Sequence, residues 1–72
     1  MNDIKEAYEK ELENHNSIRT KAIQKGDGTI AERERYYMKG YLTALLICNI
    51  INQKTYDHYM IFGNAPKYNK GE

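Results

Sequence analysis

Apolar and polar residues recur along the first third of the chain with the period of an α-helix. At 100° per residue one stripe collects most of the apolar side chains together with His15, and consists of Ile4, Ala7, Tyr8, Leu12, His15, Ile18 and Ala22. Asn2 or Asp3 can cap the N-terminus of this helix, and Gly26 can adopt the left-handed conformation that often follows a helix C-terminus. The pattern predicts an amphipathic helix over residues 4–24.

A second helix is predicted over residues 30–48, after the turn Gly26-Asp27-Gly28. Thr29 and Glu32 have the spacing of a capping box, in which each side chain meets the other residue's backbone amide. One face of this helix is expected to pack on the first helix and contains Ile30, Tyr37, Tyr41, Ala44, Leu45 and Cys48. A second apolar face contains Leu42, Leu46, Ile47 and Ile50, with Tyr36 and Thr43 at its edge.

The segment Asn49-Ile50-Ile51-Asn52 is typical of a tight corner. Asn49 tolerates the left-handed conformation, and Asn52 can cap a third helix over residues 53–62. Tyr56, Tyr59 and Met60 would then face inward. An alternative is that the second helix continues without a break into the third.

The predicted fold class is therefore all-α, with an antiparallel helical hairpin and a short third helix in one domain over residues 1–66. Residues 67–72 would form a polar tail. A helix that is apolar on nearly all sides must be buried on several sides, and a chain of 72 residues has little with which to cover it. We therefore expect a homodimer or a higher oligomer. The expected interface consists of Gly40, Leu42, Thr43, Leu46, Ile47 and Ile50.

Part of the chain carries a resemblance. The run Tyr37-Met38-Lys39-Gly40-Tyr41-Leu42-Thr43-Ala44-Leu45, followed by Asn49-Ile50-Ile51-Asn52 and Tyr56, resembles a helix–corner–helix pattern. Small helical proteins of Firmicutes phages and mobile elements, with unknown functions, often show this pattern. The resemblance covers about a third of the chain. It implies a helical fold and a phage or mobile-element origin, and it transfers no active site.

Composition narrows the class of protein. The net charge of +1 gives no global preference for nucleic acid or for an acidic surface. Cys48 is the only cysteine, so we interpret it as a small buried side chain in a reducing compartment. The apolar run 41–51 is too short to span a membrane, and the N-terminus lacks the pattern of a signal peptide. A cytoplasmic location without membrane contact is expected.

The candidate chemistry is sparse. Glu11 and His15 lie four residues apart, the spacing of a hydrogen-bonded pair on one helix. No nucleophile–base set, phosphate loop or metal-ligand motif accompanies them, so we expect neither enzymatic activity nor a cofactor or metal. Basic and aromatic residues are the expected partner-binding set, namely Tyr36, Arg33, Arg35, Lys39 and Tyr59.

These features favour a small non-enzymatic protein-interaction module. The phage-like resemblance suggests that its partner is a host protein, such as a defence or transcription factor, which it would modulate and most simply inhibit. The alternative is a nucleic-acid-binding regulator that uses the basic residues near the hairpin turn.

Overall fold

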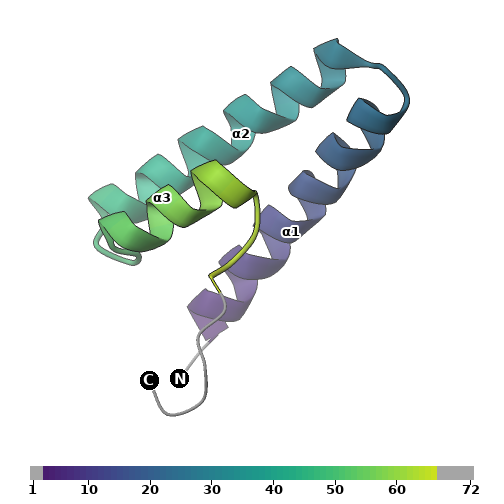
Figure 1. The fold of residues 1–72 in the computed structure, drawn as a ribbon. Coiled ribbons are helices and arrows are strands. Elements are labelled where there is room, and N and C mark those ends of the chain that lie inside the picture. The colour runs from purple at the N-terminus through teal and green to yellow at the C-terminus, as the bar shows by residue number, and fades with distance from the viewer. Residues whose placement is uncertain (1–2, 67–72) are drawn as a thin grey trace.

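The computed structural model describes residues 3–66, and helices are the only regular secondary structure within that range (Figure 1). Helix α1 spans Asp3–Gln24, α2 spans Gly28–Ile47 and α3 spans Gln53–Phe62. The prediction of an all-α fold with two long packed helices and a short third helix is confirmed. The predicted polar tail at residues 67–72 lies outside the described residues.

The turn between α1 and α2 is closed by backbone hydrogen bonds around Gly26. This glycine has a φ of 78°, and its amide donates to the Ile23 carbonyl at 3.1 Å. The Asp27 amide donates to the Ala22 carbonyl at 2.8 Å, which completes a Schellman motif. The predicted left-handed position of Gly26 is therefore confirmed.

The predicted capping box at Thr29 and Glu32 is wrong. Asp27 caps α2 instead, because its Oδ1 accepts a hydrogen bond from the Ile30 amide at 3.1 Å. Asp27 is the last residue of the Schellman motif that ends α1. Its side chain is therefore the first acceptor along the chain that can cap the next helix. The helix therefore begins at Gly28, two residues earlier than the capping box implies.

The corner between α2 and α3 has the same construction. Asn49 adopts a φ of 61°, its amide donates to Leu46 at 3.0 Å, and the Ile50 amide donates to Leu45 at 2.9 Å. The Asn52 side chain then accepts from the Thr55 amide at 2.8 Å and caps α3. Both asparagines have their predicted roles, and the alternative of a continuous second helix is wrong.

The core forms where α2 meets both other helices. Figure 1 shows the hairpin of α1 and α2, with α3 folded back along α2 at the end away from the turn. The core consists of Tyr8, Leu12, Met38, Leu42, Leu45, Ile51 and Tyr59. Within it, Leu12 and Leu42 have no solvent exposure at all.

The predicted division of the second helix into two faces is wrong in part. Met38, Leu42 and Leu45 share one stripe at i, i+4 and i+7, and this stripe is the one that is buried. Ala44 and Cys48, which were expected to pack on the first helix, are exposed. Cys48 is therefore not the buried side chain that the sequence suggested.

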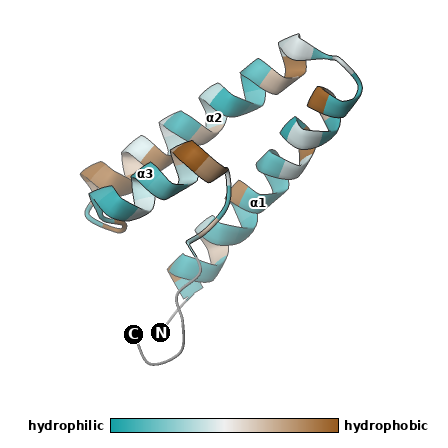
Figure 2. Ribbon diagram, viewed as in Figure 1, coloured by the Kyte–Doolittle hydropathy of each residue, from teal (hydrophilic) through white to brown (hydrophobic). Residues whose placement is uncertain are grey.

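Hydropathy is unevenly distributed over the helices. Figure 2 shows hydrophobic colour concentrated in the last part of α2 and at the end of α3, while α1 is mostly hydrophilic. Among residues 3–66, no helix combines the length and the apolar character needed to cross a bilayer.

Candidate functional site

The side of α2 that faces away from the core is largely apolar and exposed. We call it the outer face of α2 and define it by Tyr36, Gly40, Thr43, Ala44 and Ile47. Tyr36 is 58% exposed and Ile47 is 74% exposed. A Cβ atom added to Gly40 would meet no heavy atom within 4 Å, so no neighbouring segment covers this glycine. Thr43 is half-buried, and its hydroxyl lies 3.5 Å from the Tyr56 hydroxyl of α3 at the edge of the face.

The spacing along the outer face matches the contact seam of a coiled coil. Tyr36, Gly40, Thr43 and Ile47 follow one another at intervals of four, three and four residues. Ile50, three residues further on in the corner, is 42% exposed. Four of the six residues expected at an oligomer interface (Gly40, Thr43, Ile47 and Ile50) therefore lie on or next to one open surface.

The other two expected interface residues lie elsewhere. Leu42 is fully buried in the core, so it is unavailable to a second copy of the folded chain, and its assignment to that surface is corrected. Leu46 is partly buried and packs against the core cluster. Both positions are covered within the chain because α3 folds back along α2, a contact that helical periodicity in one segment does not reveal.

Most of the expected partner-binding residues are exposed. Arg33, Arg35, Lys39 and Tyr36 all lie on the surface of α2, and the Arg35 guanidinium carbon lies 6.0 Å from the centre of the Tyr36 ring. Tyr59 differs, because only 3% of its surface is exposed and its ring belongs to the core. It therefore cannot act as an exposed aromatic anchor.

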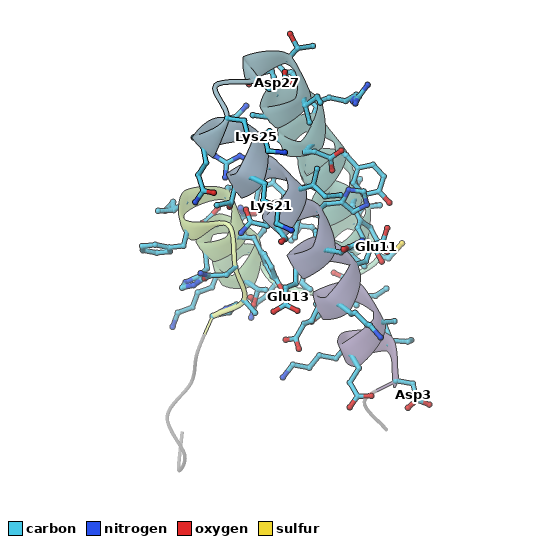
Figure 3. All side chains as sticks on the ribbon, turned by 90° about the vertical axis from the view of Figure 1, so that its right-hand side faces the viewer. Asp3, Glu11, Glu13, Lys21, Lys25 and Asp27 are labelled. Atoms are coloured by element: carbon cyan, nitrogen blue, oxygen red, sulfur yellow. The ribbon has the colours of Figure 1, made fainter. Side chains whose placement is uncertain are left out.

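A polar network joins α1 to α2 beside the core. His15 Nε2 lies 3.1 Å from Glu11 Oε2, and His15 Nδ1 is hydrogen-bonded to Glu34 Oε1. The Tyr37 hydroxyl donates to Glu11 at 2.8 Å, and its ring stacks on the imidazole with 4.0 Å between ring centres. Figure 3 shows Glu11 projecting from the opposite side of α1 to Glu13.

Titration in this network is shifted by the mutual contacts. Hydrogen bonds to Glu34 and then to Glu11 raise the pKa of His15, in spite of partial burial, because both carboxylates stabilise the protonated ring. The pKa of Glu11 is lowered, first by the Tyr37 hydroxyl and then by His15. The hydrogen bond to Glu11 also raises the pKa of Tyr37.

The network has the features of a structural contact that holds α1 against α2. Both ring nitrogens of His15 already contact carboxylates, which leaves neither free to act as a base or to bind a metal. Within residues 3–66, no cluster of three or more histidine, cysteine, aspartate or glutamate side chains could hold a metal ion.

Only half of this network is predictable from spacing along one helix. The Glu11–His15 pair was predicted from its spacing, whereas its partners on α2 were missed. A signal was present, because Glu34 lies three and seven residues before Tyr37 and Tyr41, on the face that was expected to pack on the first helix. An acid on that face indicates a buried or half-buried partner on the facing helix.

Comparison with known proteins adds no further assignment. No protein-family model matches the chain, and neither a curated protein nor a solved structure matches it.

Proposed function

We propose that the chain is a non-enzymatic protein-interaction module that associates with a second copy through the outer face of α2. The observation that supports this most strongly is Gly40. A glycine inside a helix costs about 1 kcal/mol relative to alanine, and no neighbouring segment approaches Gly40 closely enough to require it. A second helix packed on this face would use the space that the missing side chain leaves.

An antiparallel arrangement of the two α2 helices fits the residues best. A two-fold axis between Gly40 and Thr43 would bring Tyr36 of one copy opposite Ile47 of the other, so large side chains meet at both ends and small ones at the centre. Antiparallel packing also separates the two Arg33–Arg35 ends, which would repel each other if the helices ran parallel.

The expected dimer is weak. A specific interface usually buries about 800 Å² on each partner, which is about a seventh of the 5547 Å² surface of this chain. One face of a single helix provides an interface at the low end of that range. We therefore expect a dimer that dissociates on dilution, and not an obligate one.

The dimer hypothesis is tested by replacing one exposed isoleucine. Ile47→Glu should shift the protein to monomer in sedimentation velocity, because the charge would be buried in an apolar seam. Its melting temperature under dilute conditions should change little, since Ile47 is 74% exposed in the single chain. Ile61→Glu is a matched control, because Ile61 is 72% exposed on α3, away from the outer face.

Two outcomes contradict the hypothesis. One is a wild-type protein that stays monomeric over the whole accessible concentration range. The other is an equal effect of Ile47→Glu and Ile61→Glu on association, because general hydrophobic adhesion would then explain both results.

We further propose that the same protein binds and modulates a second, unrelated protein. This step rests on the exposed Arg33, Arg35 and Lys39 beside Tyr36, since arginine and tyrosine are enriched in binding surfaces. Charge reversal at Arg35, which lies outside the outer face of α2, should then weaken partner capture while leaving self-association of that face intact.

A further inference from the structure

A small pocket lies where the C-terminal end of α3 meets the other two helices. Its cavity of about 60 Å³ has room for about four water-sized groups, at roughly 10–15 Å³ for each. A drug-sized ligand needs a pocket of about 300–1,000 Å³. The volume therefore suits a single short side chain.

The pocket has an apolar inner wall and a basic rim. Met38 and Leu42 line it and are 5% and 0% exposed, so they form the inner wall. Arg19 of α1 is half-buried and Arg35 of α2 is exposed, and they line the pocket from two different helices. A ligand with one apolar group and one negative charge would match this division.

Arg19 is held at the pocket through Asn16. A Cβ atom added to Gly63 at the end of α3 would lie 2.8 Å from Asn16 Oδ1, so the asparagine side chain packs directly against this glycine. Arg19 Nη1 donates to the same oxygen at 3.4 Å. The guanidinium group is therefore placed beside the end of α3, where Asn16 and Gly63 also line the pocket.

The two arginines at the rim have no negatively charged partner. Among residues 3–66, neither forms an ion pair with a carboxylate, and no acidic residue of that range lines the pocket. The partly negative C-terminal end of α3 borders the pocket, but within the same range neither arginine donates a hydrogen bond to its carbonyl groups. Like charges repel each other, and an anion bound between them would relieve the repulsion.

We propose that the pocket binds the carboxyl-terminal residue of a partner protein. The apolar side chain of that residue would lie against Met38 and Leu42. Its free carboxylate would accept hydrogen bonds from Arg19 and Arg35, whose planar guanidinium groups match the geometry of a carboxylate.

A carboxyl-terminal residue fits the pocket better than an internal acidic residue. It carries the carboxylate and the apolar side chain on one Cα atom, so both groups reach one small cavity together. An internal acidic residue would need an apolar neighbour, and neighbouring side chains of an extended peptide point to opposite sides.

This inference rests on the proposed binding of a second protein and specifies the group that is recognised. It is independent of self-association, because none of the four residues assigned to the ligand belongs to the outer face of α2. The inference and the proposed function can also fail separately. If partner capture depends on Arg35 but is unaffected by Arg19→Gln and by free N-acetyl-leucine, partner binding stands and the assignment to this pocket is overturned.

The probe is N-acetyl-leucine, titrated into the full chain at neutral pH and low salt. Binding is followed by the methyl NMR signals of Met38 and Met60, which both line the pocket. We expect saturable shifts of these signals. N-acetyl-leucinamide lacks the charge and N-acetyl-alanine lacks the branched side chain, so each should bind at least about tenfold more weakly. Equal binding of the leucinamide, or no saturable shifts with N-acetyl-leucine, would overturn the proposal.

Arginine variants separate a binding role from a structural one. Arg19→Gln and Arg35→Gln should each weaken binding of N-acetyl-leucine about tenfold, the loss expected for one hydrogen bond between charged groups. Arg33→Gln is the matched control, because it removes the same charge from α2 at a position that does not line the pocket. Arg35 is exposed, so its variant should fold even if Arg19→Gln is destabilised.

Two results with these variants would overturn the proposal. An equal loss of binding in all three would mean that the probe is attracted only by the overall charge. A lower melting temperature of Arg19→Gln and Arg35→Gln together with unchanged binding would mean that both arginines only stabilise the end of α3.

Other occupants of the pocket would give different results. Inorganic phosphate that shifts the same methionine signals at a lower concentration than N-acetyl-leucine would indicate a phosphate ligand, such as a nucleic-acid backbone. Dissociation of a dimer by Arg19→Gln in sedimentation velocity would indicate that a second copy of the chain fills the pocket. Either result would overturn the assignment to the carboxyl terminus of a partner.

Discussion

Leu42→Ala is the sharpest single test of how α2 is oriented in the fold. Leu42 is fully buried, and truncating a buried leucine to alanine costs about 2–5 kcal/mol, more where the cavity cannot collapse. At about 0.05–0.15 kcal/mol per residue, a 72-residue chain has a free energy of unfolding of about 4–11 kcal/mol. The substitution should therefore remove a large part of the total stability.

Thermal and urea denaturation followed by circular dichroism measure this effect. A loss of about 2 kcal/mol corresponds to a fall in melting temperature of about 10 °C for a domain of this size. The loss should be the same at every protein concentration, because Leu42 packs within its own chain. Ile61→Ala is the control, since Ile61 is 72% exposed and should change stability by less than about 0.5 kcal/mol.

The opposite result would refute this orientation of α2. If Leu42→Ala changed the unfolding free energy little in dilute solution and mainly weakened association, Leu42 would be a subunit contact. In that case the stripe formed by Met38, Leu42 and Leu45 would not be the core of the single chain.

Three further outcomes follow from local contacts. Because the pKa of His15 is raised in the folded chain, protonation of His15 adds to the free energy of unfolding below the ordinary histidine pKa of 6.5. This stabilisation is lost as the pH rises through the pKa of His15 in the folded chain. His15→Gln should therefore remove this fall in stability with rising pH, as measured by urea denaturation at several pH values. Asp27→Ala should cost about 1 kcal/mol in the same assay, and Thr29→Ala much less, because only Asp27 caps α2. Gly26→Ala should cost about 1–2 kcal/mol from backbone strain alone, since a Cβ there meets no neighbour.

The helix ends were largely predictable because their signals are local. Gly26, Asn49 and Asn52 act within a few residues of themselves, so their types determine where the chain can turn and where a helix can start. The misplaced cap shows the limit of such signals. Asp27 and Thr29 both suit a cap, and the choice between them depends on how closely the preceding turn follows α1.

The orientation of α2 was harder to predict because it depends on contacts between distant segments. A helix with apolar residues on nearly all sides offers several stripes of similar hydrophobicity, and periodicity alone does not rank them. The structure buries the stripe with Leu42, which can meet α1 and α3 together. The two carboxylate partners of His15 also come from different helices, so pairing along one helix could reveal only Glu11.

The position of α3 changes what the apolar character of α2 implies. The apolar pattern of α2 predicts that Leu42 and Leu46 contact a partner molecule, whereas the chain itself buries Leu42 and partly buries Leu46 by folding α3 back at the corner of Asn49. The surface of α2 that is left exposed is narrower and has Gly40 at its centre. A second helix could approach closely there, because no side chain would have to be displaced. Such a surface favours a reversible contact between two folded chains, because each chain buries its core without that contact. Self-association should therefore be tunable by single substitutions on the outer face, with little effect on the unfolding of the isolated chain.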